Sequence, residues 1–280
     1  MKKKNCKILV CTHKDFNYVA NDSFFPILVG SSKNNAKSEY QRDDEGDNIS
    51  SKNKNYCELT GLYWAWKNLE NYDYIGLCHY RRYFNFKSKK NRQVTNQQFV
   101  SSIRDYSFEE SFIEDFDVIL SKPIIYPETN QTFYYKSHIP EDLKLLQDII
   151  YENYPDYIRA YKNVMNRNFL YPYNMFITNK ENFNNYCEWL FAVLDKLESQ
   201  LIVSHYPYQA RVFGFLSERL LNVYVEHHNF QKKEIGIDLI VDNVKKSSFV
   251  DEFIQKYLKK TIFFFTKKNR LLVIPFYNSK

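Results

Sequence analysis

A short apolar segment that runs into basic residues, at 72–84, most constrains how this chain can fold. Tyr74–Cys78 has the length and composition of a buried strand, and His79, Arg81 and Arg82 follow it directly. In an open α/β sheet, ligands bind beyond the carboxyl ends of the strands. Two guanidinium groups and an imidazole at that place suit an anion such as a phosphate or diphosphate. The alternative is a basic surface turn without a ligand.

The segments before this strand follow the order of a nucleotide-binding α/β sheet. The expected elements are strands at Lys7–Cys11 and Phe25–Val29, a long polar loop at 31–54, a helix at Tyr56–Leu69 and the strand at Tyr74–Cys78. Asn55 is the expected helix N-cap, and Glu58 stands at capping-box spacing from it. This order is typical of the nucleotide-binding half of an open α/β sheet.

The second half of the chain alternates helices with short strands. Helices are expected at about 140–163, 180–201 and 207–221, and strands at Phe116–Leu120, Asn174–Ile177 and Asn222–Glu226. The predicted fold class is therefore α/β, an open mixed sheet flanked by helices. We expect residues 1–230 to form this domain and residues 231–280 to be a C-terminal extension.

Composition and charge narrow the range of partners. The chain has 280 residues and a net charge of +6, which favours anionic partners but falls short of a nucleic-acid-binding signature. Its five cysteines show no metal-type pairing, as expected of reduced thiols in the cytoplasm. The apolar run after the basic start is too short for a signal peptide, and no run has the length of a membrane span. We expect a cytoplasmic or membrane-peripheral protein that does not bind nucleic acid.

The segment 244–280 combines an excess of basic residues with many aromatic ones. That combination favours docking to the surface of the inner membrane. The alternative is a C-terminal helix and strand that pack on the domain.

The turn Thr12-His13-Lys14 follows the first expected strand, where nucleotides lie in such sheets. The sequence has neither the Gly-x-Gly-x-x-Gly of dehydrogenases nor the Walker A motif of phosphate-loop ATPases. His13 by itself is equally consistent with a surface residue that has no ligand.

Sugar transfer from a nucleotide donor requires stabilisation of a diphosphate leaving group. Either a divalent cation on an Asp-x-Asp motif or basic side chains supply it. Asp115-Phe116-Asp117 enters its strand rather than leaving it, so a site for Mn²⁺ or Mg²⁺ has no well-placed ligands. The pair Arg81 and Arg82 is the better candidate, with salt bridges to the acidic loop at 43–47 as its alternative.

Further polar residues are candidates for sugar contacts. Asp47 suits hydroxyl groups, Trp64 suits stacking on a ring, and Asn174 precedes a buried strand with its amide available. His138 is a candidate general base, with a place beside a helix N-cap as the alternative. Glu58 is interpreted as a capping residue, and the acidic and basic residues at 211–219 as structural.

These motifs together resemble a bacterial glycosyltransferase family found with capsular polysaccharide, lipopolysaccharide O-antigen and exopolysaccharide synthesis genes, whose domain was long described as of unknown function. The resemblance covers about residues 5–228 in consistent order. The residues that carry it are Thr12-His13-Lys14, Pro26–Gly30, Gly46-Asp47-Asn48-Ile49-Ser50, Asn53, Tyr56–Thr60, Tyr63–Asn68, Tyr74-Ile75-Gly76, His79–Phe84, Asn174–Ile177 and Gly214–Leu220.

The resemblance implies a GT-A-like fold and a UDP-sugar donor, with galactose or galactofuranose as the transferred hexose. The acceptor is then a growing surface glycan, either free or lipid-linked. Three groups of residues receive roles: His79, Arg81 and Arg82 at the diphosphate; Thr12, His13 and Lys14 at the nucleotide; and Asp47, Asn48, Thr60, Trp64 and Asn174 at the ribose or donor sugar. His138 is expected near the sugars as the candidate base. A sugar-phosphate transferase and a non-catalytic module that binds acidic glycan or nucleic acid remain as alternatives.

Overall fold

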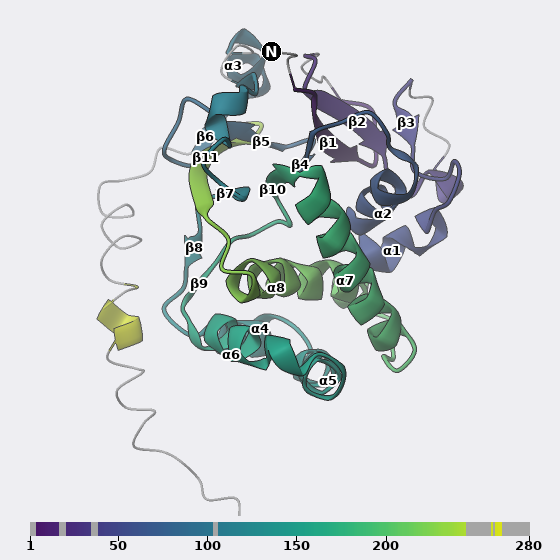
Figure 1. Ribbon diagram of the computed structural model, residues 1–280, viewed down its shortest axis with the longest axis vertical. Helices are drawn as coiled ribbons and strands as arrows, with labels where there is room; N and C mark the ends of the chain where they lie inside the picture. The colour runs from purple at the N-terminus through teal and green to yellow at the C-terminus, as the bar shows by residue number, and fades with distance from the viewer. Residues whose placement is uncertain are drawn as a thin grey trace, which may run out of the picture.

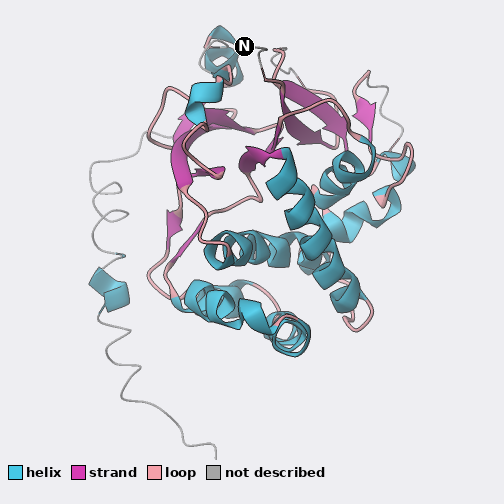
Figure 2. Ribbon diagram, in the orientation of Figure 1, coloured by secondary structure: helices cyan, strands magenta, loops and turns pink. Residues whose placement is uncertain are grey.

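One mixed sheet of nine strands runs through the part of the chain that this computed structural model describes, residues 4–16, 21–34, 39–102, 106–244, 259 and 261–264. The strands are β1 (Cys6–Thr12), β2 (Phe24–Leu28), β3 (Gln41–Arg42), β4 (Tyr74–His79), β5 (Arg82–Asn85), β6 (Arg92–Val94), β7 (Val118–Ser121), β10 (Phe176–Asn179) and β11 (Lys232–Ile240). Two further strands, β8 (Ile124–Ile125) and β9 (Phe169–Leu170), pair separately. The predicted α/β class is confirmed (Figures 1 and 2).

The strand order brings three chain segments to one edge of the sheet. β1 lies between β2 and β4 and runs parallel to both. β10 lies antiparallel to β4 and β7, so the residues just before β10 lie at the carboxyl end of β4. β11 runs parallel to β7 and antiparallel to β5. The strands predicted from the first 80 residues are confirmed to within a residue or two.

Both faces of the central strands are covered by hydrophobic cores. Successive side chains of a strand point to opposite faces. Leu9 and Cys11 of β1 therefore join the core under the large helices, and Ile8 and Val10 join the core on the other face. Burial on both sides explains why β1 is apolar along almost its whole length.

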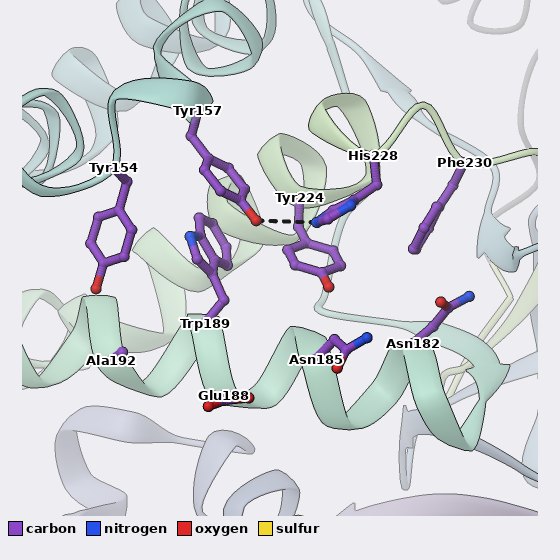
Figure 3. Close-up of a pocket in the computed structure, with 10 residues that line it drawn as sticks. All are labelled: Tyr154, Tyr157, Asn182, Asn185, Glu188, Trp189, Ala192, Tyr224, His228 and Phe230. Atoms are coloured by element: carbon purple, nitrogen blue, oxygen red, sulfur yellow. Dashed lines mark hydrogen bonds between the residues drawn. The ribbon is translucent and has the colours of Figure 1, made fainter.

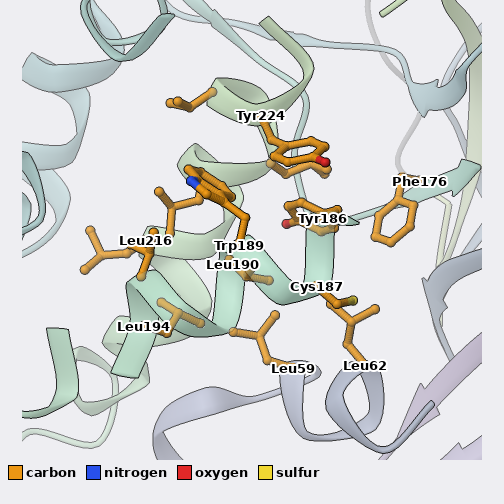
Figure 4. Close-up of a cluster of buried hydrophobic side chains, with 14 of the residues drawn as sticks. Leu59, Leu62, Phe176, Tyr186, Cys187, Trp189, Leu190, Leu194, Leu216 and Tyr224 are labelled. Carbon is orange, nitrogen blue, oxygen red and sulfur yellow. The ribbon is translucent and has the colours of Figure 1, made fainter. Parts of the chain in front are cut away.

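Helices cover one face of the sheet (Figure 1). They are α1 (Asn53–Tyr56), α2 (Leu59–Asn68), α7 (Lys180–Glu198) and α8 (Val212–His227), with α4 (Asn130–Ser137), α5 (Pro140–Asn153) and α6 (Ile158–Asn166) beyond α8; a short helix, α3 (Asn96–Ser101), lies near β11. Figure 4 shows leucines of α2 meeting α7 and α8 in one cluster, with Leu59, Cys187 and Leu216 among its members. This packing fixes the start of α2 against the start of α8.

The predicted helix over 56–69 is interrupted. It is two helices, α1 and α2, separated at Cys57, whose φ of 52° no α-helix accommodates. Asn55 is not an N-cap, because it lies inside α1, where its side-chain amide donates to the carbonyl of Ala210. No side chain caps α2, so the interpretation of Glu58 as a capping residue is wrong.

The predicted helix over 140–163 is also divided. It breaks before Pro155, because proline lacks an N–H and disfavours helical backbone at the preceding residue. The chain then resumes as α6 after one short turn.

The chain beyond residue 221 differs most from expectation. The predicted strand at Asn222–Glu226 is wrong: α8 continues to His227, and an apolar run of that length fits a buried helix as well as a strand. β11 then enters the main sheet, so the sheet extends to Ile240, within the segment expected as an extension from 231. The basic and aromatic segment at 244–280 lies almost entirely outside the described residues. In the part of the chain that is described, no helix has the length and hydrophobicity needed to cross a bilayer.

Candidate functional site

The ends of β1 and β4 bring two of the predicted motifs together. Cys11 pairs with His79 across the two strands, and the N–H of Tyr80 donates to the carbonyl of Cys11 at 3.1 Å. The Tyr80 ring is the shared contact, because the His13 ring lies 5.3 Å from it and Lys14 Nζ lies 5.6 Å from its centroid. The two polar turns predicted at the carboxyl edge of the sheet therefore form one cluster.

Thr12 shapes this cluster from within. It is 1% exposed, its hydroxyl donates to the carbonyl of Lys14 at 2.5 Å, and the N–H of Lys14 returns a bond to the same hydroxyl at 3.1 Å. These bonds turn the chain sharply after β1 and expose His13 and Lys14. The Thr12 side chain thus positions the turn.

Four cations surround the cluster without a salt bridge among the described residues: Lys14, Arg81, Arg82 and Arg211. The Arg82 guanidinium lies 4.3 Å from the centroid of the Tyr173 ring, and its buried Nε has no hydrogen-bond partner. The acidic loop at 43–47 does not neutralise the arginines, since Asp44 pairs with Arg42 instead. A buried donor without a partner beside unpaired cations is the arrangement that an anionic ligand completes.

A carboxylate lies among these cations. Asn174, which is 1% exposed, donates from Nδ2 to Glu58 Oε1 at 2.7 Å and lies 2.9 Å from Ser217 Oγ. Asn174 precedes β10 and Ser217 lies in α8, so tertiary contacts from both elements hold Glu58 in place. The geometry presents one carboxylate in a cationic environment.

The backbone around Glu58 is strained. Cys57 has φ 52° and ψ −129°, and the consecutive residues Tyr173 and Asn174 have φ 70° and φ 53°. Side chains other than glycine rarely adopt positive φ, and each such residue costs about 1–3 kcal/mol. Gly214 allows the approach, because a Cβ there would lie 3.2 Å from the sulfur of Cys57. Strain of this kind gathers at functional sites, where the surrounding fold maintains it.

His79 contributes an uncharged imidazole to the cluster. Its Nε2 lies 2.8 Å from the carbonyl of Tyr173. Burial lowers the pKa of His79, and the charges of Arg82 and Arg211 lower it further, while Glu58 opposes the shift. For His13, burial and the neighbouring Lys14 and Arg81 lower the pKa in the same way. Both rings are therefore neutral at physiological pH, and the fixed positive charge comes from lysine and arginine.

A second carboxylate, Glu218, lies on the α8 side of the cluster. Burial raises the pKa of Glu218, and the charge of Glu58 raises it further, while Arg219, whose Nη1 lies 3.2 Å from Glu218 Oε2, opposes the shift. The Glu218 side chain remains 21% exposed, so its proton can exchange with a bound molecule. A partly exposed carboxyl with a raised pKa is suited to general acid–base chemistry.

An aromatic wall, defined here as His138, Tyr208 and Phe215, extends from Glu218. The centroid of the His138 ring lies 4.0 Å from that of Phe215 and 5.8 Å from that of Tyr208, with which it stacks. Burial lowers the pKa of His138 to about 4, so this ring is also neutral. The Tyr208 side chain is 57% exposed and gives the wall an open surface.

Four residues predicted to contact the donor lie apart from this cluster. Asp47 and Asn48 lie beside the carboxyl-terminal end of α2, where Asn68 hydrogen-bonds both the N–H and the carbonyl of Asp47. Thr60 is fully buried and donates to the carbonyl of Cys57, and Trp64 stacks on Phe25 at 6.1 Å between ring centroids. In the structure these four side chains stabilise loop and core.

Metal-ligating residues are not gathered in the described part of the chain. No group of three or more His, Cys, Asp or Glu side chains there has a geometry suited to a metal ion. Asp117 lies at the amino end of β7, where its carboxylate accepts from the N–H of Gln231. That is the opposite edge of the sheet from His79.

Sequence reasoning missed Glu58, Tyr173, Arg211 and Glu218 as members of the cluster. Glu58 was assigned to a helix cap because of its spacing from Asn55, and Glu218 to the surface of a helix. One signal was available for Glu58 and Glu218, because they lie inside Tyr56–Thr60 and Gly214–Leu220, two motifs that carried the family resemblance.

Comparisons with known proteins agree with the fold. The profile of a domain of unknown function, DUF4422, matches residues 7–229. Among solved structures, the apo structure of the WbbM bifunctional glycosyltransferase superposes with a TM-score of 0.76 at 28% sequence identity. The match covers 88% of this chain and 47% of that one, so the chain spans about half the length of WbbM. Comparison with curated protein sequences gave no match.

The structural match confirms the resemblance drawn from the sequence and the GT-A-like fold that it implied. The family profile covers most of the chain, from β1 to the end of α8, and includes every residue of the cluster described above. The chain belongs to the DUF4422 family.

Proposed function

We propose that this protein is a glycosyltransferase that moves a hexose, galactose or galactofuranose, from a UDP-sugar to a growing surface glycan. The observation that carries the proposal is the set of unpaired cations at the carboxyl ends of β1 and β4, where Arg82 has a buried donor without a partner. The similarity to WbbM supports a transferase acting on sugars. Both point to a negatively charged donor bound at this edge of the sheet.

The cations stabilise the leaving group. Arg81, Arg82 and Arg211 neutralise the diphosphate as the bond to the sugar breaks. The neutral ring of His79 donates its one N–H to the carbonyl of Tyr173 and so holds that segment beside the arginines. His13 and Lys14 contact the nucleotide, on the turn that Thr12 fixes. Charge that develops on the diphosphate thus meets preorganised donors, whether or not a divalent cation assists.

The two carboxylates serve the sugar side of the reaction. Glu58, held by Asn174, binds hydroxyl groups of the donor sugar and orients it. Glu218 faces the aromatic wall and accepts the proton of the attacking acceptor hydroxyl if the transfer inverts the anomeric carbon. The acceptor glycan packs the C–H face of its terminal sugar on His138, Tyr208 and Phe215.

The membrane association of the protein is a further part of the proposal. A lipid-linked acceptor at the inner membrane agrees with the basic and aromatic composition of residues 244–280. Sedimentation with anionic vesicles, before and after deletion of 244–280, tests this. Unchanged binding would remove the segment from the proposal.

Nucleotide binding and transfer test the central claim. A ligand that binds the native state raises the melting temperature. UDP and UDP-sugars should therefore raise it more than GDP or CMP, both in the presence of Mn²⁺ and in the presence of EDTA. Arg81→Ala and Arg82→Ala should weaken the UDP effect, while Lys144→Ala, an exposed cation on α5, serves as the matched control.

Mass spectrometry of the products then identifies the reaction. A product heavier by one hexose with release of UDP supports a glycosyltransferase, and phosphorus retained in the new linkage indicates a sugar-phosphate transferase. Polyanion binding without any response to UDP would contradict both. If transfer requires Mn²⁺ absolutely and the activity survives both Arg81→Ala and Arg82→Ala, the assigned diphosphate site is wrong.

A further inference from the structure

A cavity lies at the carboxyl-terminal end of α8, and its lining is separate from the cationic cluster. It has a volume of about 420 Å³, within the range of sites that bind small molecules, and opens between α7, the end of α8 and the turn at 154–157. Figure 3 shows the side chains of Tyr157, Trp189 and Tyr224 gathered above one face of α7. None of the residues that line this cavity belongs to the cluster around Glu58.

Position along α8 separates the two sites. Glu218 belongs to the cluster, and His228, ten residues further on, lines the cavity. At 1.5 Å per residue, this corresponds to roughly 15 Å along the helix axis. The cavity therefore lies apart from the residues of the cationic cluster.

The aromatic rings of the cavity hold one another in fixed positions. The ring of Tyr157 stacks on Trp189 with 4.6 Å between centroids, and the ring of Tyr224 lies 5.3 Å from Trp189. The Tyr157 hydroxyl forms a hydrogen bond of 3.1 Å with His228 Nε2, which Figure 3 draws as a dashed line. Trp189 is 8% exposed, and its indole N–H has no hydrogen-bond partner. The buried rings of Trp189 and Tyr224 therefore make a rigid base for the cavity, and Tyr157 remains partly exposed above them.

Polar side chains follow one face of α7 beside these rings. Asn182, Asn185 and Glu188 stand three residues apart, so they lie on the same side of the helix over roughly 9 Å. In the part of the chain that the structure describes, the side chains of Asn185 and Glu188 form no hydrogen bond or ion pair. They therefore remain available to a ligand.

The charge of the lining selects among ligands. Glu188 is its only acidic side chain, and it contains neither lysine nor arginine. A nucleotide or an acidic polymer would meet a carboxylate here without a compensating cation. Aromatic faces beside amide and carboxylate groups instead match the alternating C–H faces and hydroxyl groups of a neutral sugar.

We propose that this cavity is a second glycan-binding site, which holds a neutral stretch of the glycan while its end is extended at the cationic cluster. The choice of a glycan as occupant rests on the proposed function. A sugar ring packs against the half-buried Tyr154 and Tyr157 at the mouth of the cavity, and its hydroxyl groups hydrogen-bond to the exposed side chains of Asn185 and Glu188. The cavity thereby raises the affinity of the protein for long acceptors relative to short ones.

Nuclear magnetic resonance of the indole N–H groups tests this inference directly. The chain has three tryptophans, and Trp189→Phe assigns the signal that belongs to the cavity. Titration with neutral galacto-oligosaccharides of increasing length should shift the Trp189 signal in a saturable way. Trp64 and Trp66, which pack on Phe25 and Phe191, should not respond.

Two variants on α7 provide the matched comparison. Asn185→Ala combined with Glu188→Ala should weaken oligosaccharide binding about ten-fold or more, the loss expected when two hydrogen bonds to the ligand are removed. Glu181→Ala, an exposed acid on the same helix outside the cavity, should leave binding unchanged. Equal weakening by both variants, or no saturable shift with any oligosaccharide, would overturn the proposal.

Choline tests for a different class of ligand, because aromatic rings beside a carboxylate can also bind a quaternary ammonium group. A shift of the Trp189 signal by choline and not by oligosaccharides would show a site for quaternary ammonium groups and would overturn the proposal. Transfer by the unaltered protein to a monosaccharide acceptor reports on the proposed function by itself. If oligosaccharides bind but no transfer occurs, the cavity is a glycan site and the proposed function is wrong. If transfer occurs but no oligosaccharide binds, the proposed function holds and the glycan site is wrong.

Discussion

Two acidic sites of this molecule, at Asp43 and Glu58, are built in opposite ways. Asp43 is fully buried and accepts four hydrogen bonds, from the N–H of Gly30, the N–H and hydroxyl of Ser31, and the hydroxyl of Ser50. Glu58 has one side-chain donor, the amide of Asn174, and lies near Arg82 and Arg211, which form no salt bridge among the described residues. The hydrogen-bonding capacity of Asp43 is filled by its own loop, whereas that of Glu58 is not.

The difference separates structural from functional charge. A saturated carboxylate has no capacity left for a ligand, and Asp43 uses all of its capacity to fold the long loop at 30–50 onto the sheet. Beside Asp43, the positive φ of 68° is at Gly30, and glycine adopts that conformation without strain. Around Glu58 the strain is at Cys57, Tyr173 and Asn174, where it costs free energy. We expect substitutions at the first site to reduce stability and those at the second to reduce activity.

Asp43→Ala should have the largest effect. Because it leaves two buried N–H groups and two hydroxyls without an acceptor, it should lower the free energy of unfolding by about 3–5 kcal/mol. Urea denaturation measures this. Asp44→Ala, which removes a partly exposed pair with Arg42, should cost about 0–1 kcal/mol. Similar losses for the two variants would contradict the structural role of Asp43.

Glu58→Gln should reverse the pattern. The amide keeps the size of the side chain but removes the charge, so the unfolding free energy should change by less than about 1 kcal/mol. The kcat/KM for sugar transfer should fall about 100-fold, equivalent to about 3 kcal/mol of transition-state stabilisation. Steady-state kinetics with the preferred UDP-sugar checks this, with Glu45→Gln in the acidic loop as control. Full activity of Glu58→Gln would remove Glu58 from the site.

The strain at Cys57 gives a smaller and sharper test. Glycine adopts a φ of 52° without penalty, whereas alanine does not. Cys57→Gly should therefore be more stable than Cys57→Ala by about 1–2 kcal/mol, although both lose the sulfur contact with Arg211. Parallel urea denaturation of the pair gives the difference directly. A more stable alanine variant would show that the backbone here is relaxed.

The aromatic wall predicts the smallest effect, a dependence of stability on pH. The pKa of His138 is about 4 in the folded protein and about 6.5 when unfolded, so the unfolded chain binds the proton more tightly between these values. Its stabilising contribution is complete above pH 6.5 and is lost as the pH falls toward 4. From pH 7 to pH 5, the unaltered protein should lose about 1 kcal/mol more stability than His138→Phe. Parallel pH profiles of the two proteins would contradict a buried, neutral ring.

Much of the site was accessible from sequence because it depends on local pattern. Short apolar runs followed by polar residues predicted where β1 and β4 end, and the parallel order then predicted that His13 and Arg82 would lie at one edge. The members that were missed depend on contacts between distant segments. Glu58 and Asn174, for example, are 116 residues apart in the chain.

The sequence by itself determined the central strands, the positive charge at their carboxyl ends and the α/β class. Those properties follow from apolar periodicity and residue type, which act over a few neighbouring residues. Tertiary structure alone decided the break at Cys57, the return of β11 into the sheet and the cavity between α7 and α8. Each of these depends on how distant segments pack, because packing can impose a positive φ, select helix over strand in an apolar run, and leave a space between rings that no local pattern records.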